Sequence, residues 1–438
     1  MKIFHVLSHF LPGQIAGTEL YVFGLQENLQ QLGYEGGVII PEYVEHKNHE
    51  YTYENIRVLC YQQAAATKDE IFGKAYPSGL GRFKKMLENE KPDLIHFHEI
   101  TGSNGISIGH LEVVSTLEIP MVFTFHLVGY VCPTGTLIEA KKELCDGRVS
   151  AFRCTNCSYQ YKGISPGLAG LLAMASVGIN TLGLKMYGQG GAFGTAISMA
   201  EQVANHSSRL HRIENMVSNI IVPNDWYKEM LEKNGVEPEK ISVIKHALFT
   251  RVQQVKPLQR SNVSHDEPLK LVFVGRIHWA KGLDVLLKAL QTICDLPYRL
   301  DIYGPTNDNE YYKKCLEIIH GNENIRWMGK IPLGMTVDRL KEYDFLCVPS
   351  MVSETGPMVI LEAFEAGISV IASNVFGNNN LVKNNENGWL FERGNIKELN
   401  ALITRLIVKR TRLVPTASLR KFGDLITEYD MIYKQVLK

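Results

Sequence analysis

Two series of alternating strand-like and helix-like stretches, joined by a polar segment, constrain the fold of this chain most strongly. The first series opens with an apolar run at Lys2 to Ser8, a loop at Leu11 to Gly17 and an amphipathic stretch at Thr18 to Leu32. The second opens with an apolar run at Leu269 to Val274 and a helix-like stretch near Leu283 to Leu290. Because strands that alternate with helices usually form parallel sheets, the pattern predicts an α/β chain with two Rossmann-like lobes facing each other across a cleft.

Other apolar runs have the length of strands and complete the two series. They are Gly36–Pro41, Ile56–Tyr61, Asp93–Phe97, Pro120–Phe125, Ile220–Pro223 and Ile241–Ile244 in the first series, and Arg299–Tyr303 and Phe345–Ser350 in the second.

The boundaries of the lobes follow from the length of the chain and from one polar segment. A chain of 438 residues is longer than one ordinary core accommodates. The polar stretch Val252 to Pro268 is interpreted as the linker. We therefore expect an amino-terminal lobe over residues 1–251, a carboxyl-terminal lobe over residues 269–415 and a closing helix within residues 416–438. Asp424 to Leu437 supports that helix, because its apolar residues fall on one helical face.

The charge balance and the amino terminus limit the classes of function. The 46 basic residues are matched by 46 acidic ones, so nothing electrostatic favours a nucleic-acid partner. The amino terminus carries only a short apolar run before His9 and Pro12, which is typical of a first strand rather than of a signal peptide. We therefore expect a cytoplasmic protein whose cysteines stay reduced.

Two glutamates stand eight positions apart in the segment SETGPMVILEAFEAG, directly after the apolar run Phe345 to Ser350. The run is interpreted as a buried strand, and Pro357 as the start of a helix that Gly367 closes. Glu354 then lies at the carboxyl end of the strand, and Glu362 lies in the helix. Ligands of open α/β sheets bind at this edge, where the first turn of a helix favours phosphate. Carboxylates beside phosphate need hydrogen-bond donors such as sugar hydroxyls, so the layout predicts a nucleotide-sugar pocket.

The same segment carries a family resemblance. Its matching residues are Glu354, Gly356-Pro357, Glu362-Ala363 and Ala366-Gly367. This pattern resembles the signature of the retaining glycosyltransferases of family 4, which have the two-domain fold called GT-B. The resemblance implies that Glu362 holds the ribose hydroxyls of the nucleotide and that Glu354 contacts the donor sugar, with Gly356 and Met358 in the donor site. The sequence departs from the family at Thr355, where members more often carry Gly-Phe-Pro or Gly-Leu-Pro soon after the first glutamate.

The second series opens with VFVGRIHWAKGLDVLLKAL, in which Gly275-Arg276 follows a strand and Lys281-Gly282 precedes a helix. These pairs resemble the family's diphosphate-binding pairs, so the resemblance implies that Gly275, Arg276 and Lys281 bind the donor diphosphate. Negative charge grows on the diphosphate as the sugar leaves, and two fixed cations stabilise it most at the transition state. If both cations neutralise the diphosphate, no catalytic metal is required.

Further stretches of the second series also belong to the predicted pocket. Gly304 ends the strand at Arg299 to Tyr303, where a glycine lets the backbone approach a ligand closely. Val375-Phe376-Gly377 and Asn387 to Leu390 resemble the stretches that usually follow the second glutamate in the family. Residues 378–380, all asparagine, replace a glycine and a glutamate that are common there.

The first series contributes weaker signals. Gly17, in Ala16-Gly17-Thr18-Glu19, resembles the family's glycine-rich loop and would let the backbone approach donor or acceptor, although a simple turn fits equally well. His126 ends a strand and resembles the histidine that the family places beside the transferred sugar, with a core histidine as the alternative. We expect one of His96 and His98 to face the cleft, and we expect neither to bind a metal, because nothing nearby in the sequence completes a ligand set.

Four cysteines form a separate cluster. Cys132, Cys145, Cys154 and Cys157 fall within 26 residues and interrupt the amino-terminal lobe as an insertion near residues 132–157. Four thiolates bind one tetrahedral zinc ion strongly, so a structural Zn²⁺ is one interpretation. Four unliganded thiols are the alternative, and disulfides are disfavoured in a reducing cytosol.

The segment between Gly163 and Ala200 is apolar and carries one charged residue, Lys185. Pro166 and several glycines argue against a membrane-spanning helix. A helical hairpin that touches the inner face of a membrane holding a lipid-linked acceptor is one interpretation. A buried or partner-facing hairpin is the other.

Taken with the resemblance, these features predict a cytoplasmic hexosyltransferase. It would move a sugar from a nucleotide-sugar donor, bound by the carboxyl-terminal lobe, to a glycan or lipid-linked acceptor, bound by the amino-terminal lobe, with retention of configuration. Catalysis would require closure of the lobes. Such an enzyme would serve polysaccharide biosynthesis for the cell envelope. The alternatives are a phosphorylase-like or epimerase-like enzyme of the same fold, and a sugar-nucleotide-binding protein without turnover.

Overall fold

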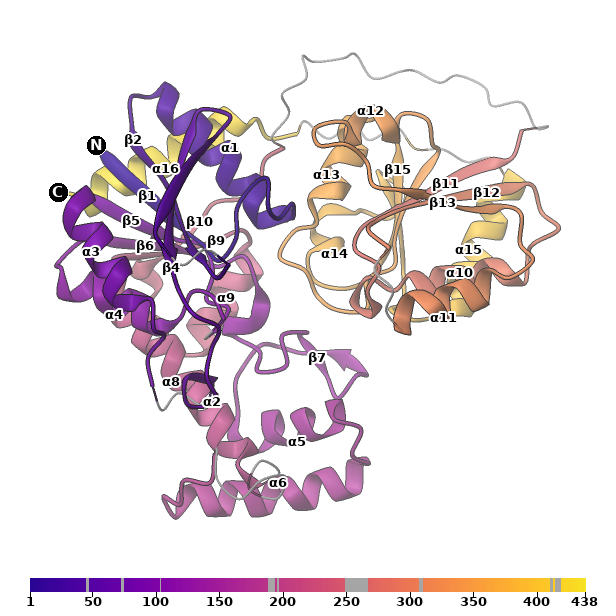
Figure 1. The fold of residues 1–438 in the computed structure, drawn as a ribbon. Helices are drawn as coiled ribbons and strands as arrows, with labels where there is room; N and C mark the ends of the chain where they lie inside the picture. Colours follow the sequence, from indigo (N-terminus) through magenta and orange to yellow (C-terminus); the bar gives the residue numbers. More distant parts are fainter. Residues whose placement is uncertain are drawn as a thin grey trace. The chain divides into compact units, whose positions relative to one another are not determined.

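The computed structural model describes residues 1–44, 47–71, 75–102, 104–187, 194, 197–248, 267–306, 310–409, 413 and 419–438. The chain divides into two compact units (Figure 1). The first unit comprises Met1–Lys245 and Phe422–Lys438, and the second comprises His246–Lys421. The predicted linker at Val252 to Pro268 lies outside the described residues except for its last two positions.

The first unit is built on an eight-stranded sheet with the strand order β10-β9-β6-β5-β1-β2-β4-β3. Every pairing is parallel except that of β3 with β4, which is antiparallel. The strands are β1 (Lys2–Val6), β2 (Glu35–Glu42), β3 (His49–Tyr53), β4 (Ile56–Gln62), β5 (Leu94–Phe97), β6 (Met121–Thr124), β9 (Asn219–Val222) and β10 (Ile241–Val243).

Helices follow the strands of the first sheet, as the alternation in the sequence predicts. They are α1 (Gly17–Gln31), α2 (Lys68–Ile71), α3 (Leu80–Glu90), α4 (Ile108–Thr116), α9 (Asp225–Lys233) and the last helix of the chain, α16 (Phe422–Val436). The predicted strands match β1, β2, β4, β5, β6, β9 and β10 to within a few residues. The edge strand β3 was not predicted, because its sequence HEYTY alternates polar and aromatic residues and both faces are partly exposed.

Helix α16 lies within the first unit, although it is last in the sequence. It packs against α1, and the Tyr429 hydroxyl lies 2.7 Å from the Tyr21 hydroxyl. The Tyr433 hydroxyl lies 2.7 Å from His96 Nδ1 on the central strand β5. These buried hydrogen bonds fix the helix to the sheet, because each polar group would otherwise be buried without a partner.

The second unit is a six-stranded parallel sheet with the strand order β13-β12-β11-β14-β15-β16. Its strands are β11 (Leu269–Val274), β12 (Tyr298–Tyr303), β13 (Ile325–Gly329), β14 (Phe345–Val348), β15 (Ser369–Ser373) and β16 (Gly388–Phe391). Its helices are α10 (Leu283–Gln291), α11 (Glu310–Ile319), α12 (Thr336–Leu340), α13 (Met358–Glu365), α14 (Asn378–Leu381) and α15 (Ile396–Lys409).

The two faces of the second sheet are both buried, as expected for a parallel sheet covered by helices. Successive residues of β11 point to opposite faces, so Leu271 and Phe273 belong to one apolar cluster and Val272 to another. The amphipathic helices α10 and α15 pack against each other over the first cluster. The rigid sheet holds the loops at the carboxyl ends of its strands in place, and those loops carry most of the predicted site.

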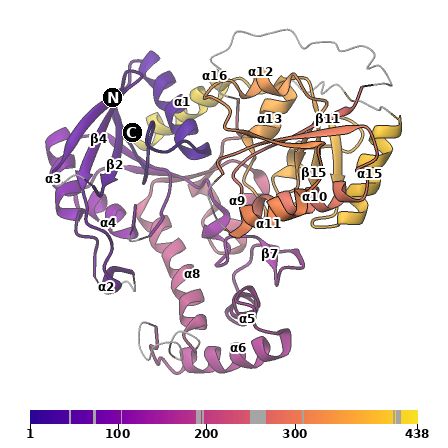
Figure 2. The same cartoon turned by 45° about the vertical axis from the view of Figure 1, so that its right-hand side comes forward.

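An insertion separates β6 from β9 in the first unit (Figures 1 and 2). It contains the short turn η1 (Val128–Tyr130), the hairpin of β7 (Ile138–Glu139) and β8 (Glu143–Leu144), and the helices α5 (Ala151–Tyr161), α6 (Pro166–Thr181) and α8 (Met199–Met216). The three helices contact one another, and Figure 2 shows α5 and α6 beside the lower end of α8. The predicted hairpin between Gly163 and Ala200 is described only through Tyr187, at 194 and from 197 onward.

Candidate functional site

Three loops of the second unit lie together at the carboxyl ends of neighbouring strands. They follow β11, β14 and β15, which pair side by side in that order. Met351 N donates a hydrogen bond to Ala280 O at 2.8 Å, which joins the first loop to the second. Glu354 N donates to Phe376 O at 2.9 Å, which joins the second loop to the third. The backbone itself therefore holds these loops in one arrangement.

Two glycines permit this close packing of loops. Gly282 has φ +67°, and a Cβ added there would lie 1.9 Å from Pro349 O. Gly377 has φ +90°, and a Cβ there would lie 1.9 Å from Glu354 O. Any other residue would be strained by its backbone conformation and would collide with a neighbouring carbonyl group. Both positions lie in stretches that resemble the family, Lys281-Gly282 and Val375-Phe376-Gly377.

Lys281 and Glu354, predicted separately to contact the donor, form an ion pair with each other. Lys281 Nζ lies 2.6 Å from Glu354 Oε2, and the side chains are 27% and 15% exposed. Ser350 Oγ donates to the other carboxylate oxygen, Oε1, at 2.5 Å. The carboxylate is thus oriented by two donors while one side of the pair still meets solvent. Ser350 is a supporting residue that the sequence did not single out.

Arg276 lies near the start of the loop that also carries Lys281, and its side chain is exposed. Among the residues that the structure describes, it makes no hydrogen bond or ion pair, so its guanidinium group is available to a ligand. His278 lies near both cations: burial lowers its pKa, and the positive charges of Arg276 and Lys281 lower it further. The loop is therefore a region of positive potential that an anion such as diphosphate would neutralise.

Glu362 lies on α13, which begins at Met358 directly after Pro357. Burial raises the pKa of Glu362 to about 7, and a hydrogen bond from the Thr336 side chain opposes that rise. A carboxyl group with this pKa is half ionised at neutral pH. Hydrogen-bond donors from a ligand would favour its ionised form.

The remaining predicted glycines of the second unit differ in what they contact. A Cβ at Gly304 would lie 2.2 Å from Gly275 O, so the close approach there is to the neighbouring backbone as well as to any ligand. A Cβ at Gly275 would make an ordinary contact, 3.6 Å from the Phe273 ring. At Gly356, φ is +147° and a Cβ would lie 2.5 Å from His246 Cδ2, so glycine is required by a packed side chain.

In the first unit, His126 ends a chain of buried imidazoles. His126 Nε2 lies 3.1 Å from His98 Nδ1, and His98 Nε2 lies 2.9 Å from His5 Nδ1. His126 is 8% exposed, and the other two are fully buried. The expectation that one of His96 and His98 faces a cleft is wrong, because both side chains are completely buried. His96 instead bonds to Thr124 Oγ1 at 2.8 Å.

His5 and His98 are neutral at physiological pH, because burial lowers the pKa of His5 to about 3 and that of His98 well below its usual value. A neutral imidazole has one N–H, so His98, bonded through both nitrogens, donates to one neighbour and accepts from the other. The tautomer of His126 is therefore linked to that of His98. The sequence analysis did not identify His5. His5 in β1 pairs with His96 in β5, so its proximity to the other histidines could be predicted only from the strand order.

His5, His96 and His98 also offer ligand atoms that all lie within 4.8 Å of one another. The expectation that nothing completes a ligand set around His96 and His98 therefore overlooked His5. The hydrogen bonds of His96 and His98 already occupy both nitrogens of each ring, so a metal here would have to displace them.

Gly17 is the first residue of α1, and a Cβ added to it would meet no atom within 4 Å. The position is therefore open, and the folded structure itself does not require a glycine there. Nearby, Glu19 is buried, and Gln14 Nε2 donates to its Oε1 at 2.6 Å. Burial raises the pKa of Glu19, so the sequence also missed a buried carboxyl group beside the predicted glycine loop.

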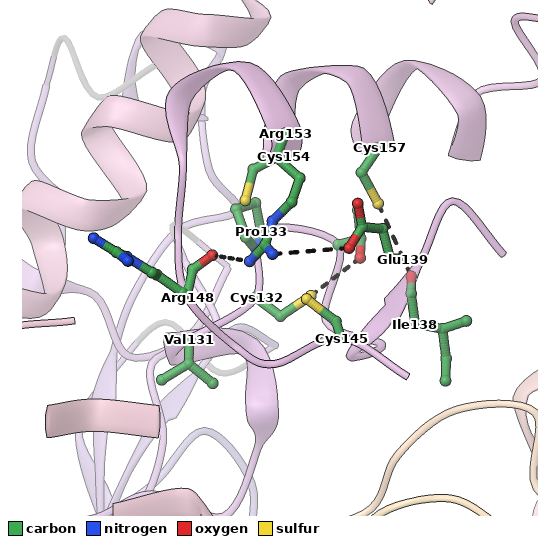
Figure 3. Close-up of a pocket in the computed structure, with 11 residues that line it drawn as sticks. Val131, Cys132, Pro133, Ile138, Glu139, Cys145, Arg148, Arg153, Cys154 and Cys157 are labelled. Carbon is green, nitrogen blue, oxygen red and sulfur yellow. Dashed lines mark hydrogen bonds and ion pairs between the residues drawn. The ribbon is translucent and has the colours of Figure 1, made fainter. Parts of the chain in front are cut away.

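The four cysteines of the predicted zinc site line one cavity in the insertion, together with Arg148, Arg153 and Glu139 (Figure 3). All four are free thiols. The helix α6 next to them exposes a row of apolar side chains, with Leu168 52%, Leu171 62% and Met174 56% exposed. Of the helices that the structure describes, none is both long and apolar enough to cross a bilayer.

Two family models match the sequence. "Glycosyl transferases group 1" matches residues 255–418, and "Glycosyltransferase Family 4" matches residues 15–146. The amylovoran biosynthesis glycosyltransferase AmsK of Erwinia amylovora is 24% identical over 211 residues, which are 46% of this chain and 48% of AmsK. The putative colanic acid biosynthesis glycosyltransferase WcaL of Salmonella typhimurium is 23% identical over 48% of this chain and 52% of its own length. The matched region thus spans about half the length of these relatives.

Solved structures with the same fold cover almost the whole chain. Sucrose-phosphate synthase from Thermosynechococcus elongatus has a TM-score of 0.66 at 16% identity, over 99% of this chain and 98% of its own. HepE from Anabaena, solved in complex with UDP-glucose, has a TM-score of 0.58 at 15% identity, over 100% and 96%. The catalytic domain of starch synthase IV from Arabidopsis thaliana has a TM-score of 0.61 at 14% identity, over 99% of each chain. At these identities the likeness establishes the fold.

Proposed function

We propose that the chain transfers a sugar from a nucleotide-sugar donor to a glycan or lipid-linked acceptor with retention of configuration. The match of residues 255–418 to the glycosyl transferases group 1 family and the GT-B fold support this proposal. The observation that carries the proposal is the convergence of Arg276, Lys281 and Glu354 on adjoining loops of the second unit. Relatives named for amylovoran and colanic acid biosynthesis support a role in polysaccharide synthesis for the cell envelope.

In the proposed donor site, each group has one task. Arg276 and Lys281 bind the diphosphate and stabilise the charge that develops as the sugar leaves, so no catalytic metal is needed. Glu362 accepts hydrogen bonds from the ribose hydroxyls, and Glu354 contacts the sugar. The proposed acceptor side is the first unit, with His126 and Gly17 near the reacting sugar. HepE, a protein of the same fold, was solved with UDP-glucose, which supports a uridine nucleotide sugar as the first donor to try.

The experiment that tests this function is a donor screen. A panel of nucleotide sugars is scored for a rise in melting temperature, because a ligand that binds only the folded protein stabilises it. The stabilising donor is then incubated with envelope glycan fragments and with lipid-linked acceptors, and nucleoside diphosphate release and the anomeric configuration of the product are measured. Acceptor-dependent release with retention supports the proposal. Binding without release would leave a sugar-nucleotide-binding protein. Formation of sugar 1-phosphate from a glycan and added inorganic phosphate would indicate a phosphorylase.

The raised pKa of Glu362 predicts a pH dependence of donor binding. Ribose hydroxyls bond best to the ionised carboxylate, so affinity for the nucleotide sugar should rise with pH until Glu362 is ionised near pH 7, by up to about tenfold per pH unit. The measurement is calorimetric titration between pH 5.5 and 8. A nucleotide sugar is the suitable probe, because its diphosphate carries no group that titrates in this window.

Glu362→Gln is the matched variant for this test. It should bind the donor more weakly than the wild type at pH 8 and show little dependence on pH. It should also melt at a higher temperature than the wild type at pH 8, because a carboxyl group whose pKa is raised in the folded state stabilises the fold at low pH and loses that contribution as pH rises through 7. Protonation of His278 would strengthen diphosphate binding at low pH and so acts with the opposite sign. An equal pH slope in wild type and variant would remove Glu362 from the donor site.

We also propose that the acceptor is lipid-linked and that α6 contacts the membrane that holds it. The row Leu168, Leu171 and Met174 supports this, because residues three apart lie on one side of a helix and large exposed apolar side chains bind the interface of a bilayer. The variant Leu168→Glu/Leu171→Glu should lose flotation with vesicles and lose most activity on a lipid-linked acceptor. Activity on a water-soluble acceptor fragment should persist.

The control for the α6 variant is Leu316→Glu, which changes an exposed leucine on α11 in the second unit. It should float with vesicles like the wild type. Equal flotation of all three proteins would contradict the membrane contact. A change from dimer to monomer in the α6 variant alone would assign the row to an interface between copies of the chain instead.

A further inference from the structure

Four cysteines from three segments of the insertion surround one small cavity (Figure 3). Cys132 follows η1, Cys145 follows β8, and Cys154 and Cys157 lie three apart on α5, so they share one side of that helix. The cavity has a volume of about 20 Å³. A space of this size holds a single water molecule or ion.

Each of the four sulfurs accepts a hydrogen bond from a backbone N–H group. Leu137 N lies 3.4 Å from Cys132 Sγ, Ala140 N lies 3.2 Å from Cys157 Sγ, and Ser150 N lies 3.3 Å from Cys154 Sγ. The backbone of Gly147 donates to Cys145. A neutral thiol is a weak acceptor, whereas a thiolate is a strong one. A backbone donor therefore already lies at every sulfur and would stabilise a thiolate there. Without a metal, the thiols of Cys145 and Cys157 also donate, to Asp146 Oδ1 and Ile138 O at 3.9 Å.

The charges that line the cavity complement such a group. Four thiolates around one divalent cation carry a net charge of −2, and Arg148 and Arg153 both line the cavity. Arg153 is held in position by ion pairs with Asp146 and with Glu139 Oε2, the latter at 3.9 Å. It also donates to Arg148 O at 2.6 Å. Arg153 is thus a fixed cation beside the thiolates and offsets part of the negative charge, whereas the Arg148 guanidinium group points away from the cavity (Figure 3).

We propose that Cys132, Cys145, Cys154 and Cys157 bind one Zn²⁺ ion in a tetrahedral, purely structural site. The four thiols lose their protons as the ion binds, and the four Zn–S bonds of about 2.3 Å fill every position of the metal. No position remains for water, so the ion takes no part in the transfer reaction. The proposal is independent of the donor site in the second unit.

The sulfurs must move together to close on the ion. Among the described residues, His5, His96 and His98 have three ligand atoms within 4.8 Å of one another. No three of the four cysteine sulfurs lie that close together. Closing on the ion would therefore require the cysteine side chains to turn toward the cavity, as rotation between staggered rotamers allows. We place the metal at the thiol cluster rather than at the histidines, because His96 and His98 already use both ring nitrogens in hydrogen bonds.

The ion would explain how a very small hairpin is held in place. Strands β7 and β8 have two residues each, which is too short for a stable hairpin on its own. Zinc would connect Cys132, which precedes the hairpin, and Cys145, which follows it, to Cys154 and Cys157 on α5. It would thereby fix the hairpin to α5. Metal binding would then supply folding free energy to the whole insertion.

The test is the metal content of the full-length protein, purified without an affinity tag that binds metals. Elemental analysis by inductively coupled plasma mass spectrometry should find about one zinc ion per chain. A mercurial thiol reagent should release that zinc stoichiometrically. X-ray absorption at the zinc edge should show four sulfur ligands at about 2.3 Å. Zinc below about 0.1 equivalent after reconstitution, nitrogen ligands at the edge, or the absorption bands of an iron–sulfur cluster would each overturn the proposal.

Two variants locate the ion. Cys154→Ser/Cys157→Ser should lower bound zinc at least tenfold, whereas Cys294→Ser, which changes an exposed cysteine in the second unit, should keep it. Zinc that persists in the double variant but disappears in His96→Gln would assign the metal to the histidine cluster and contradict the proposal. If the double variant does not fold, the absorption measurement on the wild type decides between the two sites.

Discussion

Replacing Lys281 with alanine is expected to weaken binding of the nucleoside diphosphate by about ten- to a hundredfold and to lower kcat/KM by about a thousandfold. The binding loss reflects one charge-assisted contact to phosphate. The larger loss of turnover reflects the negative charge that accumulates on the leaving diphosphate, which Lys281 would stabilise most at the transition state. The measurements are calorimetric titration with nucleoside diphosphate and the rate of its acceptor-dependent release.

The control for Lys281→Ala is Lys270→Ala. Lys270 lies near the amino end of β11, whereas the predicted site lies at the carboxyl end, and it also forms an ion pair, with Glu267 at 3.6 Å. This variant removes the same charge from the same unit and should bind and turn over normally. Equal losses in the two variants would show that net charge, rather than a contact in the site, controls binding.

Replacing Glu354 with glutamine is expected to lower kcat by about three orders of magnitude. The affinity for the nucleoside diphosphate should stay the same or increase. Lys281 is held by the Glu354 carboxylate at 2.6 Å, so loss of that charge frees the ammonium group for the diphosphate. The nucleotide sugar should bind more weakly, because the variant no longer offers a carboxylate to the sugar hydroxyls. The opposite effects on the two ligands distinguish this variant from Lys281→Ala, which should weaken both.

The control for Glu354→Gln is Glu342→Gln, which changes another glutamate of the second unit that is paired, at 2.8 Å, with Arg339. It should leave both ligands unaffected. Weaker binding of the nucleoside diphosphate itself in Glu354→Gln would mean that the carboxylate positions Lys281 instead of competing for it. That result would contradict the division of roles proposed for the donor site.

The sequence predicted correctly that Arg276 and Glu354 follow buried strands of the second unit, because that position depends on local patterns. An apolar run that gives way to glycine or polar residues marks the carboxyl end of a buried strand, and both Arg276 and Glu354 follow such runs. Parallel strands end at the same edge of a sheet. Residues far apart in the sequence could therefore be assigned to one site before the strand order was known.

What the sequence could not predict depends on which strands are neighbours. The ion pair between Lys281 and Glu354 arises because β11 and β14 lie side by side, and nothing local specifies that pairing. Gly304 likewise packs on the backbone of Gly275 because β12 flanks β11 on its other side. One of His96 and His98 was predicted to face the cleft. Both are buried instead, because β1 and α16 cover them from distant parts of the chain.

The most direct test of the donor site is a crystal structure of the protein with a nucleoside diphosphate bound. The nucleoside diphosphate is the one that corresponds to the nucleotide sugar identified by the donor screen. The diphosphate oxygens should lie within about 3 Å of Arg276 and Lys281, and the ribose hydroxyls should lie at hydrogen-bonding distance from Glu362. The Lys281 ammonium should have turned from Glu354 toward the phosphate, or should bridge the two. A nucleotide bound outside the loop at 275–282, with Lys281 and Glu354 still paired only to each other, would contradict the assignment of this site.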